Sequence, residues 1–120
     1  MIDCRLGVVE ARFADIVWQN APLTTAELVR HCAAELDWKR TTTYTVLKKL
    51  SEKGLFQLEN GLVTVKISRE EYASLQSEQY VEEAFAGSLP AFLAAFTRRK
   101  SLSPDEIAQI RKMIDDAEKE

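Results

Sequence analysis

Threonine, lysine and arginine side chains gather on one side of a short segment, residues 37–56 (DWKRTTTYTVLKKLSEKGLF). At 100° per residue this segment forms a helix whose apolar back carries Thr43, Val46, Leu47 and Leu50. Its front carries hydroxyl groups and positive charges. Threonine can contact base edges through its hydroxyl and methyl groups, and lysine and arginine can neutralise phosphates. The pattern therefore predicts a helix that binds nucleic acid.

The net charge of −3 conceals an uneven distribution of charge along the chain. Residues 1–69 hold 10 basic and 8 acidic side chains, whereas residues 70–120 hold 6 basic and 11 acidic ones. Between Trp38 and Lys66 there are 6 basic side chains and only two acidic ones, Glu52 and Glu59. Because the local field decides which partner a surface attracts, we expect DNA to face the first half and not the second.

Metal-binding, catalytic and membrane-spanning functions find no support in the sequence. Cys4, Cys32 and the lone His31 lack the spacing of a metal site or of a disulfide framework. We expect Cys32 to be buried and Cys4 to be incidental. The four glycines form no phosphate-cradling motif, so we expect no catalytic residue, no metal and no cofactor. The longest apolar run, residues 89–96, is too short for a membrane span, and no leader opens the chain, so we expect a cytoplasmic protein without membrane insertion.

The elements before and after this helix predict its scaffold. Helical spacing over residues 9–18 predicts a first helix, and Thr24 with Glu27 forms a capping box that opens a second one. The third helix follows a short turn and ends before Gly54. Two strand-like runs, residues 55–58 and 62–67, flank an Asn-Gly pair, which is a strong hairpin signal. Three helices followed by a hairpin is the plan of a winged helix-turn-helix domain, with the hairpin as its wing.

Three further amphipathic helices are expected after Ser68, two of them opened by capping boxes at Ser68 and Ser103. Their residues are too few to enclose a core, so we expect their apolar stripes to pack against a second copy of the chain in a two-fold dimer. The predicted fold is mainly α with a small β-hairpin wing, divided into a DNA-binding domain over residues 1–68 and a three-helix dimerisation domain over residues 69–120. The expected dimerisation residues are Tyr72, Tyr80, Phe85, Leu89, Phe92, Leu93, Phe96, Ile107, Ile110 and Ile114.

The order of these elements, Trp18 and the run at residues 37–56 together resemble the penicillinase-repressor family of bacterial transcriptional regulators (the BlaI/MecI/CopY group). The resemblance continues through residues 66–72 (KISREEY) and through Phe96 to the segment at residues 102–106 (LSPDE). It implies a homodimeric repressor that binds a double-stranded, pseudo-palindromic DNA operator. The half-sites of the family's operators resemble TACA and TGTA.

Carried over by position, the family's DNA contacts fall on the front of the third helix and on the wing. Thr41, Thr42 and Thr45 would read bases, because residues near the start of such a helix reach base edges. Threonine methyl groups would also suit the thymine methyls of such half-sites. Arg40, Lys48, Lys49 and, on the wing, Lys66 would hold phosphates. The full set expected to contact DNA is Lys39, Arg40, Thr41, Thr42, Tyr44, Thr45, Lys48, Lys49 and Lys66.

Two departures from the family concern how the repressor is released. The copper-responsive branch ends in a cysteine-rich hook, whereas this chain ends DDAEKE, so copper sensing by that route is not expected. The β-lactam-responsive branch has a membrane sensor metalloprotease encoded nearby as its partner and is cleaved at an Asn-Phe bond. The matching pair here is Ala95-Phe96, the candidate cleavage site, although Phe96 also fits its helix's apolar stripe. Two alternatives stay open, a regulator released by a small ligand and a protein-interaction module.

Overall fold

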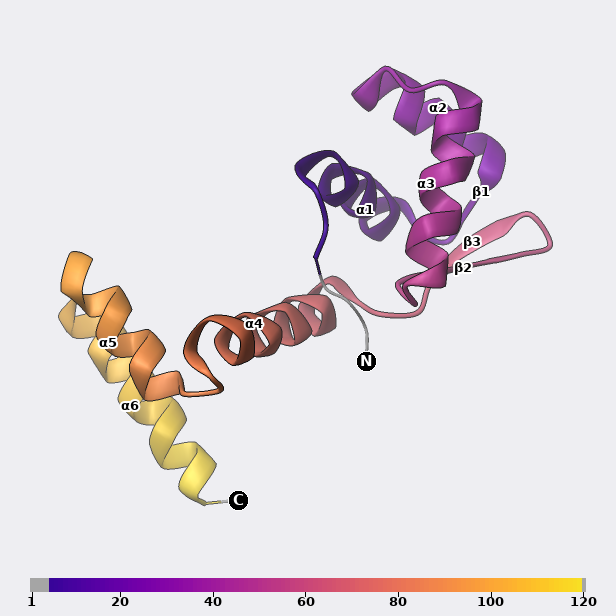
Figure 1. The fold of residues 1–120 in the computed structure, drawn as a ribbon. Helices are drawn as coiled ribbons and strands as arrows, with labels where there is room; N and C mark the ends of the chain where they lie inside the picture. Colours follow the sequence, from indigo (N-terminus) through magenta and orange to yellow (C-terminus); the bar gives the residue numbers. More distant parts are fainter. Residues whose placement is uncertain (1–4, 120) are drawn as a thin grey trace. The chain divides into compact units, whose positions relative to one another are not determined.

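A computed structural model describes residues 5–119; Cys4 lies outside the described residues. Contacts divide the chain into two compact units, the first ending at Gln79 and the second beginning at Tyr80 (Figure 1). The described residues form, in order, α1 (Val8–Asn20), β1 (Leu23–Thr24), α2 (Thr25–Leu36), α3 (Arg40–Glu52), β2 (Phe56–Glu59), β3 (Leu62–Val65), α4 (Arg69–Phe85), α5 (Leu89–Arg99) and α6 (Pro104–Glu118). This order confirms the predicted class, a winged helix-turn-helix followed by a helical region.

Both ends of α2 are closed by local contacts, and a short turn leads from its last residue to α3. Thr24 opens α2 with the predicted capping box: its hydroxyl accepts from the Glu27 N–H at 3.1 Å, and the Glu27 carboxylate accepts from the Thr24 N–H at 3.0 Å. Asp37 ends α2 in the left-handed conformation, with φ of 56°. Trp38 then donates its backbone N–H to the Cys32 carbonyl. Figure 1 shows α3 starting directly beyond this turn.

The core of the first unit lies between α1, α2, α3 and the sheet. Phe13 of α1 is fully buried, stacked on Trp38 at 5.7 Å and edge-on to Phe56 at 6.5 Å. The predicted back of α3 is confirmed, because Thr43, Leu47 and Leu50 are all buried. Each large apolar side chain removed from water contributes about 1.5–3 kcal/mol, so this core fixes which face α3 presents outward.

The wing is an antiparallel hairpin with a two-residue turn. Glu59 pairs with Leu62, and the residues between them, Asn60 and Gly61, have φ of 52° and 75°. Two consecutive positive φ values define the type I′ turn that an Asn-Gly pair favours, so the predicted hairpin is confirmed. The sheet has a third strand that the sequence did not indicate, β1, in the order β1-β3-β2. It is only two residues long, too short to show a period.

The first turns of α4 belong to the first unit. The Trp18 indole N–H donates to the Ile67 carbonyl at 2.9 Å, and the Trp18 ring lies 5.5 Å from that of Tyr72. Arg69 pairs with Asp15 of α1 at 3.2 Å. Tyr72, expected at the dimer interface, is instead a core residue of the first unit with 7% exposure, because its ring packs beside Trp18. A functional boundary between residues 68 and 69 stays a prediction, since the compact units divide within α4.

The second unit holds the end of α4 with α5 and α6. Ser88 and Ser103 cap α5 and α6, and the Ser103 capping box is formed as predicted. Aromatic rings gather between α4 and α5, with Phe92 lying 5.6 Å from Phe85 and 6.2 Å from Tyr80. No residue of α5 or α6 is buried in the single chain. The helices of this unit therefore form without a closed core.

Among residues 5–119, no helix has both the length and the apolar character that crossing a membrane requires.

Candidate nucleic-acid interface

The outward face of α3 is a hydroxyl-rich, positively charged surface. Thr41, Thr42, Thr45 and Lys48 are all exposed, whereas Thr43, one position away from Thr42, is 1% exposed. Burial of the opposite face leaves these side chains pointing away from the core. This is the surface that the sequence predicted.

The threonine hydroxyls of α3 are partly used within the helix. Thr45 donates its hydroxyl proton to the Thr41 carbonyl at 2.9 Å, and Thr43 donates to the Lys39 carbonyl at 3.3 Å. A hydroxyl that donates in this way keeps its lone pairs as acceptors. Thr45 can therefore accept a hydrogen bond from a base amino group or offer its methyl group, without giving up its bond to the helix.

Arg40 and Tyr44 lie one turn apart and are in contact. The Arg40 guanidinium carbon is 5.7 Å from the centre of the Tyr44 ring. Hydrogen bonds with Thr25, the first residue of α2, and with Arg40 lower the pKa of the Tyr44 hydroxyl. Tyr44 thus connects the start of α3 with the start of α2.

Lys49 lies on the flank of α3 that faces α1. Its ammonium group is 2.8 Å from a Glu10 carboxylate oxygen, and the other oxygen of Glu10 accepts from the Gly7 N–H at 3.0 Å. Lys49 and the Gly7 N–H lower the pKa of Glu10. Lys48 has no ion pair with a described residue. Of the two adjacent lysines, Lys48 is therefore the one whose charge is not already paired.

Lys66 was expected on the wing and lies at its base. It follows the end of β3, and its N–H donates to the Leu55 carbonyl at 2.9 Å. The tip of the wing instead carries Glu59, Asn60 and Gly61, and Glu59 accepts from the Gln57 amide at 2.9 Å. The positive charge of the wing is thus close to the strand that follows α3 and not at the tip.

The cysteine and histidine side chains of the described residues form no reactive or metal-binding site. Cys32 is fully buried, as predicted, and burial raises the pKa of its thiol. His31 is partly exposed on α2, with its Nδ1 atom 3.8 Å from a Glu35 carboxylate oxygen. Over residues 5–119 no group of three or more histidine, cysteine or acidic side chains could hold a metal ion.

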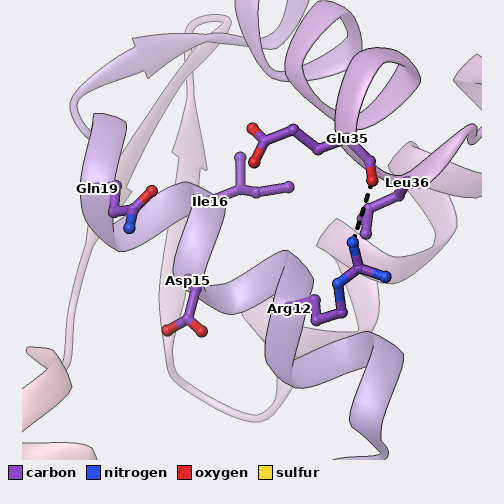
Figure 2. A pocket seen from close by; sticks show the side chains of 6 residues that line it. All are labelled: Arg12, Asp15, Ile16, Gln19, Glu35 and Leu36. Carbon is purple, nitrogen blue, oxygen red and sulfur yellow. Dashed lines mark hydrogen bonds between the residues drawn. The ribbon is translucent and has the colours of Figure 1, made fainter.

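One hollow of about 190 Å³ lies between α1 and α2 (Figure 2). Arg12 crosses one side of it and donates to the Glu35 carbonyl at 3.1 Å. Typical small-molecule sites measure about 300–1,000 Å³ and are mostly apolar. This hollow is smaller and its lining is mainly polar, with Arg12, Asp15, Ile16, Gln19, Glu35 and Leu36 around it.

The candidate cleavage pair, Ala95-Phe96, lies inside α5. The Phe96 side chain is 44% exposed, and its carbonyl accepts from the Lys100 N–H at the end of the helix. The peptide bond between the two residues is therefore held in helical conformation.

Sequence reasoning did not find the partners that hold the α3 surface in place. Glu10 and Thr25 lie far from residues 40–49 in the chain, and no short-range pattern links them to Lys49 and Tyr44. Locally, Glu10 belongs to a capping box at the start of α1, and Thr25 is the first residue of α2. These local features predict helix ends and not contacts between helices.

Comparison with known proteins identifies the family of this chain. A family model described as "Penicillinase repressor" matches residues 6–116. The chain is 20% identical over 113 residues to the methicillin resistance regulatory protein MecI of Staphylococcus aureus (strain Mu50), and the match covers 91% of this chain and 92% of that protein. Both matches run through the winged helix-turn-helix and the C-terminal helices. The chain belongs to the penicillinase-repressor family and is a transcriptional repressor of that type.

Proposed function

We propose that the chain represses transcription by binding a pseudo-palindromic DNA operator as a homodimer, through the outward face of α3. The observation that carries the proposal is the sorting of side chains on this helix. Three exposed threonines and the unpaired Lys48 lie on one face, and a buried apolar face holds the helix against the core. Bases would be read by Thr41, Thr42 and Thr45. Phosphates would be held by Arg40 and Lys48, with Lys39 at the helix start and Lys66 at the wing base as further contacts.

Lys49, which the sequence analysis expected to hold a phosphate, is not among the phosphate contacts of this proposal. Its ammonium group is already paired with Glu10, so a phosphate contact would have to share or displace that carboxylate. We assign it to holding α3 against α1.

The apolar surface of the second unit supports the proposed homodimer. Leu89, Met113 and Ile114 are each more than half exposed, and no residue of α5 or α6 is buried. A soluble chain gains by covering such a surface, and a two-fold copy of the same surface covers both at once. The residues proposed for this interface are Tyr80, Phe85, Leu89, Phe92, Leu93, Phe96, Ile107, Ile110, Met113 and Ile114.

Release by proteolysis at Ala95-Phe96 is part of the proposal and would require local unwinding. Proteolytic nicking occurs mainly in exposed loop tips, and this bond lies within α5. A cut there would separate α6 from α4 and so divide the proposed dimer surface. A membrane sensor metalloprotease encoded nearby would supply the signal, and the repressor itself would stay in the cytoplasm.

The operator proposal is tested by selecting duplexes from a random library with the full-length chain and sequencing those retained. We expect two inverted half-sites resembling TACA and TGTA, bound by two chains per duplex as measured by sedimentation. Retention of duplexes without any shared sequence would contradict the proposed base reading.

The release proposal is tested separately, by mass spectrometry of the repressor from β-lactam-treated host cells. A fragment ending at Ala95 is expected. An intact chain accompanied by derepression of the regulated gene would contradict cleavage and would favour a ligand as the signal.

A further inference from the structure

Tyr44 occupies an unusual place on the outward face of α3. It is half-buried, and its ring lies beneath the Arg40 guanidinium at 5.7 Å. A cation over an aromatic face is attracted by the ring's negative charge density. The same side chain lies close to a second helix, since Thr25 of α2, together with Arg40, lowers the pKa of its hydroxyl.

Thr25 is itself held at the junction of α2 and the wing. Its backbone N–H donates to the carbonyl of Gly61 in the wing turn at 3.1 Å, and the preceding residue, Thr24, pairs with Leu62 of β3. The Tyr44 hydroxyl therefore meets a side chain whose backbone is fixed from two directions. A long, exposed arginine lacks such support and loses rotamer freedom when it binds.

We infer that Tyr44 is a positioning residue, which holds Arg40 through its ring and hydroxyl so that the guanidinium is already in place for a DNA phosphate. The inference rests on the proposed DNA binding and adds a mechanism to it. In this arrangement Tyr44 contributes to affinity without contacting DNA. Because the backbone of Thr25 is fixed at the start of α2 and by the wing turn, its contact with Tyr44 fixes the position of the Tyr44 side chain on α3.

A double-mutant cycle separates this role from a direct contact. Affinity for the selected operator duplex is measured by fluorescence anisotropy for the full-length chain, for Arg40→Gln, for Tyr44→Phe, for Tyr44→Leu and for the double variants. Loss of Arg40 should weaken binding about tenfold. Tyr44→Phe keeps the ring and should weaken it about threefold, and Tyr44→Leu should weaken it further. In the Arg40→Gln background neither Tyr44 change should have an effect beyond about twofold.

The salt dependence of binding is a second measurement. It would not change on replacement of Tyr44 if this residue only stabilised the fold. Arg40→Gln should reduce the slope of log K against log salt by about 0.9, the value of one phosphate contact. Tyr44→Leu removes no charge, yet it should reduce the slope by a part of that amount because Arg40 is released. The matched control, Arg111→Gln on α6, should leave both affinity and slope unchanged, and unfolding midpoints show that each variant is folded.

Two outcomes would overturn the inference while leaving the proposed function standing. Additive losses in the cycle would mean that Tyr44 acts independently of Arg40, and an unchanged slope in Tyr44→Leu would mean that Tyr44 contacts DNA itself. If the unaltered chain shows no salt-dependent binding to any duplex, the proposed function fails, and this inference fails with it.

Discussion

The Lys49 ammonium group of α3 lies 2.8 Å from the Glu10 carboxylate of α1 and ties the two helices together beside the candidate DNA surface. Glu10 also caps α1 through the Gly7 N–H at 3.0 Å. One carboxylate thus fixes the start of α1 and the flank of α3. Because of this contact, Lys49 has an ion pair, whereas the adjacent Lys48 has none with a described residue.

Replacing Glu10 by glutamine should lower the free energy of unfolding by about 0.5–1 kcal/mol at neutral pH, since the ion pair is partly exposed. The pKa of Glu10 is lowered in the folded chain, first by Lys49 and then by the Gly7 N–H. A lowered pKa means that the stabilisation is present above the unfolded value, about 4.3, and is lost as pH falls through the folded value. Urea unfolding between pH 3 and pH 7 checks this.

The control for Glu10 is Glu52→Gln on the exposed end of α3, which should change stability little at any pH. A deficit in Glu10→Gln that stays constant down to pH 3 would contradict the assigned linkage.

Any side chain at Gly61 in the wing turn should lower the free energy of unfolding. This residue has φ of 75°, and a Cβ placed there would meet no atom within 4 Å. The effect of Gly61→Ala is therefore one of backbone strain alone, about 1 kcal/mol of unfolding free energy. Gly61→Asn should recover part of the loss, because asparagine adopts the left-handed conformation more readily. Equal stability of the alanine and asparagine variants in urea unfolding would contradict this explanation.

Replacing Trp18 should lower the stability of the fold more than replacing Trp38, although both side chains are half-buried against the core. Trp18 donates its indole N–H to the Ile67 carbonyl at 2.9 Å, whereas Trp38 stacks on Phe13. Phenylalanine at either position loses ring area, but only Trp18→Phe also removes that hydrogen bond, an extra loss of about 1 kcal/mol. Thermal unfolding followed by circular dichroism compares the two variants. Equal losses would show that the bond contributes nothing.

A charge at Ile114 should separate the proposed dimer. Ile114 is 54% exposed in the single chain, so Ile114→Asp should leave the fold intact. In a dimer the carboxylate would be buried without a partner, which is strongly unfavourable. We expect the sedimentation coefficient to fall to that of a monomer at micromolar concentration. Gln109→Asp, on another side of α6, is the matched control, and a dimeric Ile114→Asp would contradict the assigned interface.

Short-range sequence patterns predicted the helices and the hairpin turn well. They could not predict contacts between residues that lie far apart in the chain. Capping boxes and the Asn-Gly pair determine helix starts and a turn through neighbouring residues, so Thr24 and Gly61 were found from sequence. Tyr72 was misplaced because an apolar stripe identifies a buried face but not the surface that buries it. The pairing of Lys49 with Glu10 depends on how α1 and α3 pack, which no short spacing encodes.

The family resemblance led to the two proposals that the residues alone could not support, a pseudo-palindromic operator and release by proteolysis. The residues alone indicated only a helix that binds nucleic acid. The structure adds that Lys66 follows the end of β3 and that, among the described residues, Lys49 has an ion pair and Lys48 has none.

The salt dependence of operator binding by Lys48→Gln tests the central claim, that the outward face of α3 holds DNA. Log K should fall with log salt for the unaltered chain, and Lys48→Gln should reduce the slope by about 0.9, as expected for one phosphate contact. Lys112→Gln on α6 carries the same charge change away from α3 and should leave the slope unaltered. If Lys48→Gln binds with the slope and affinity of the unaltered chain, α3 does not hold DNA through this face.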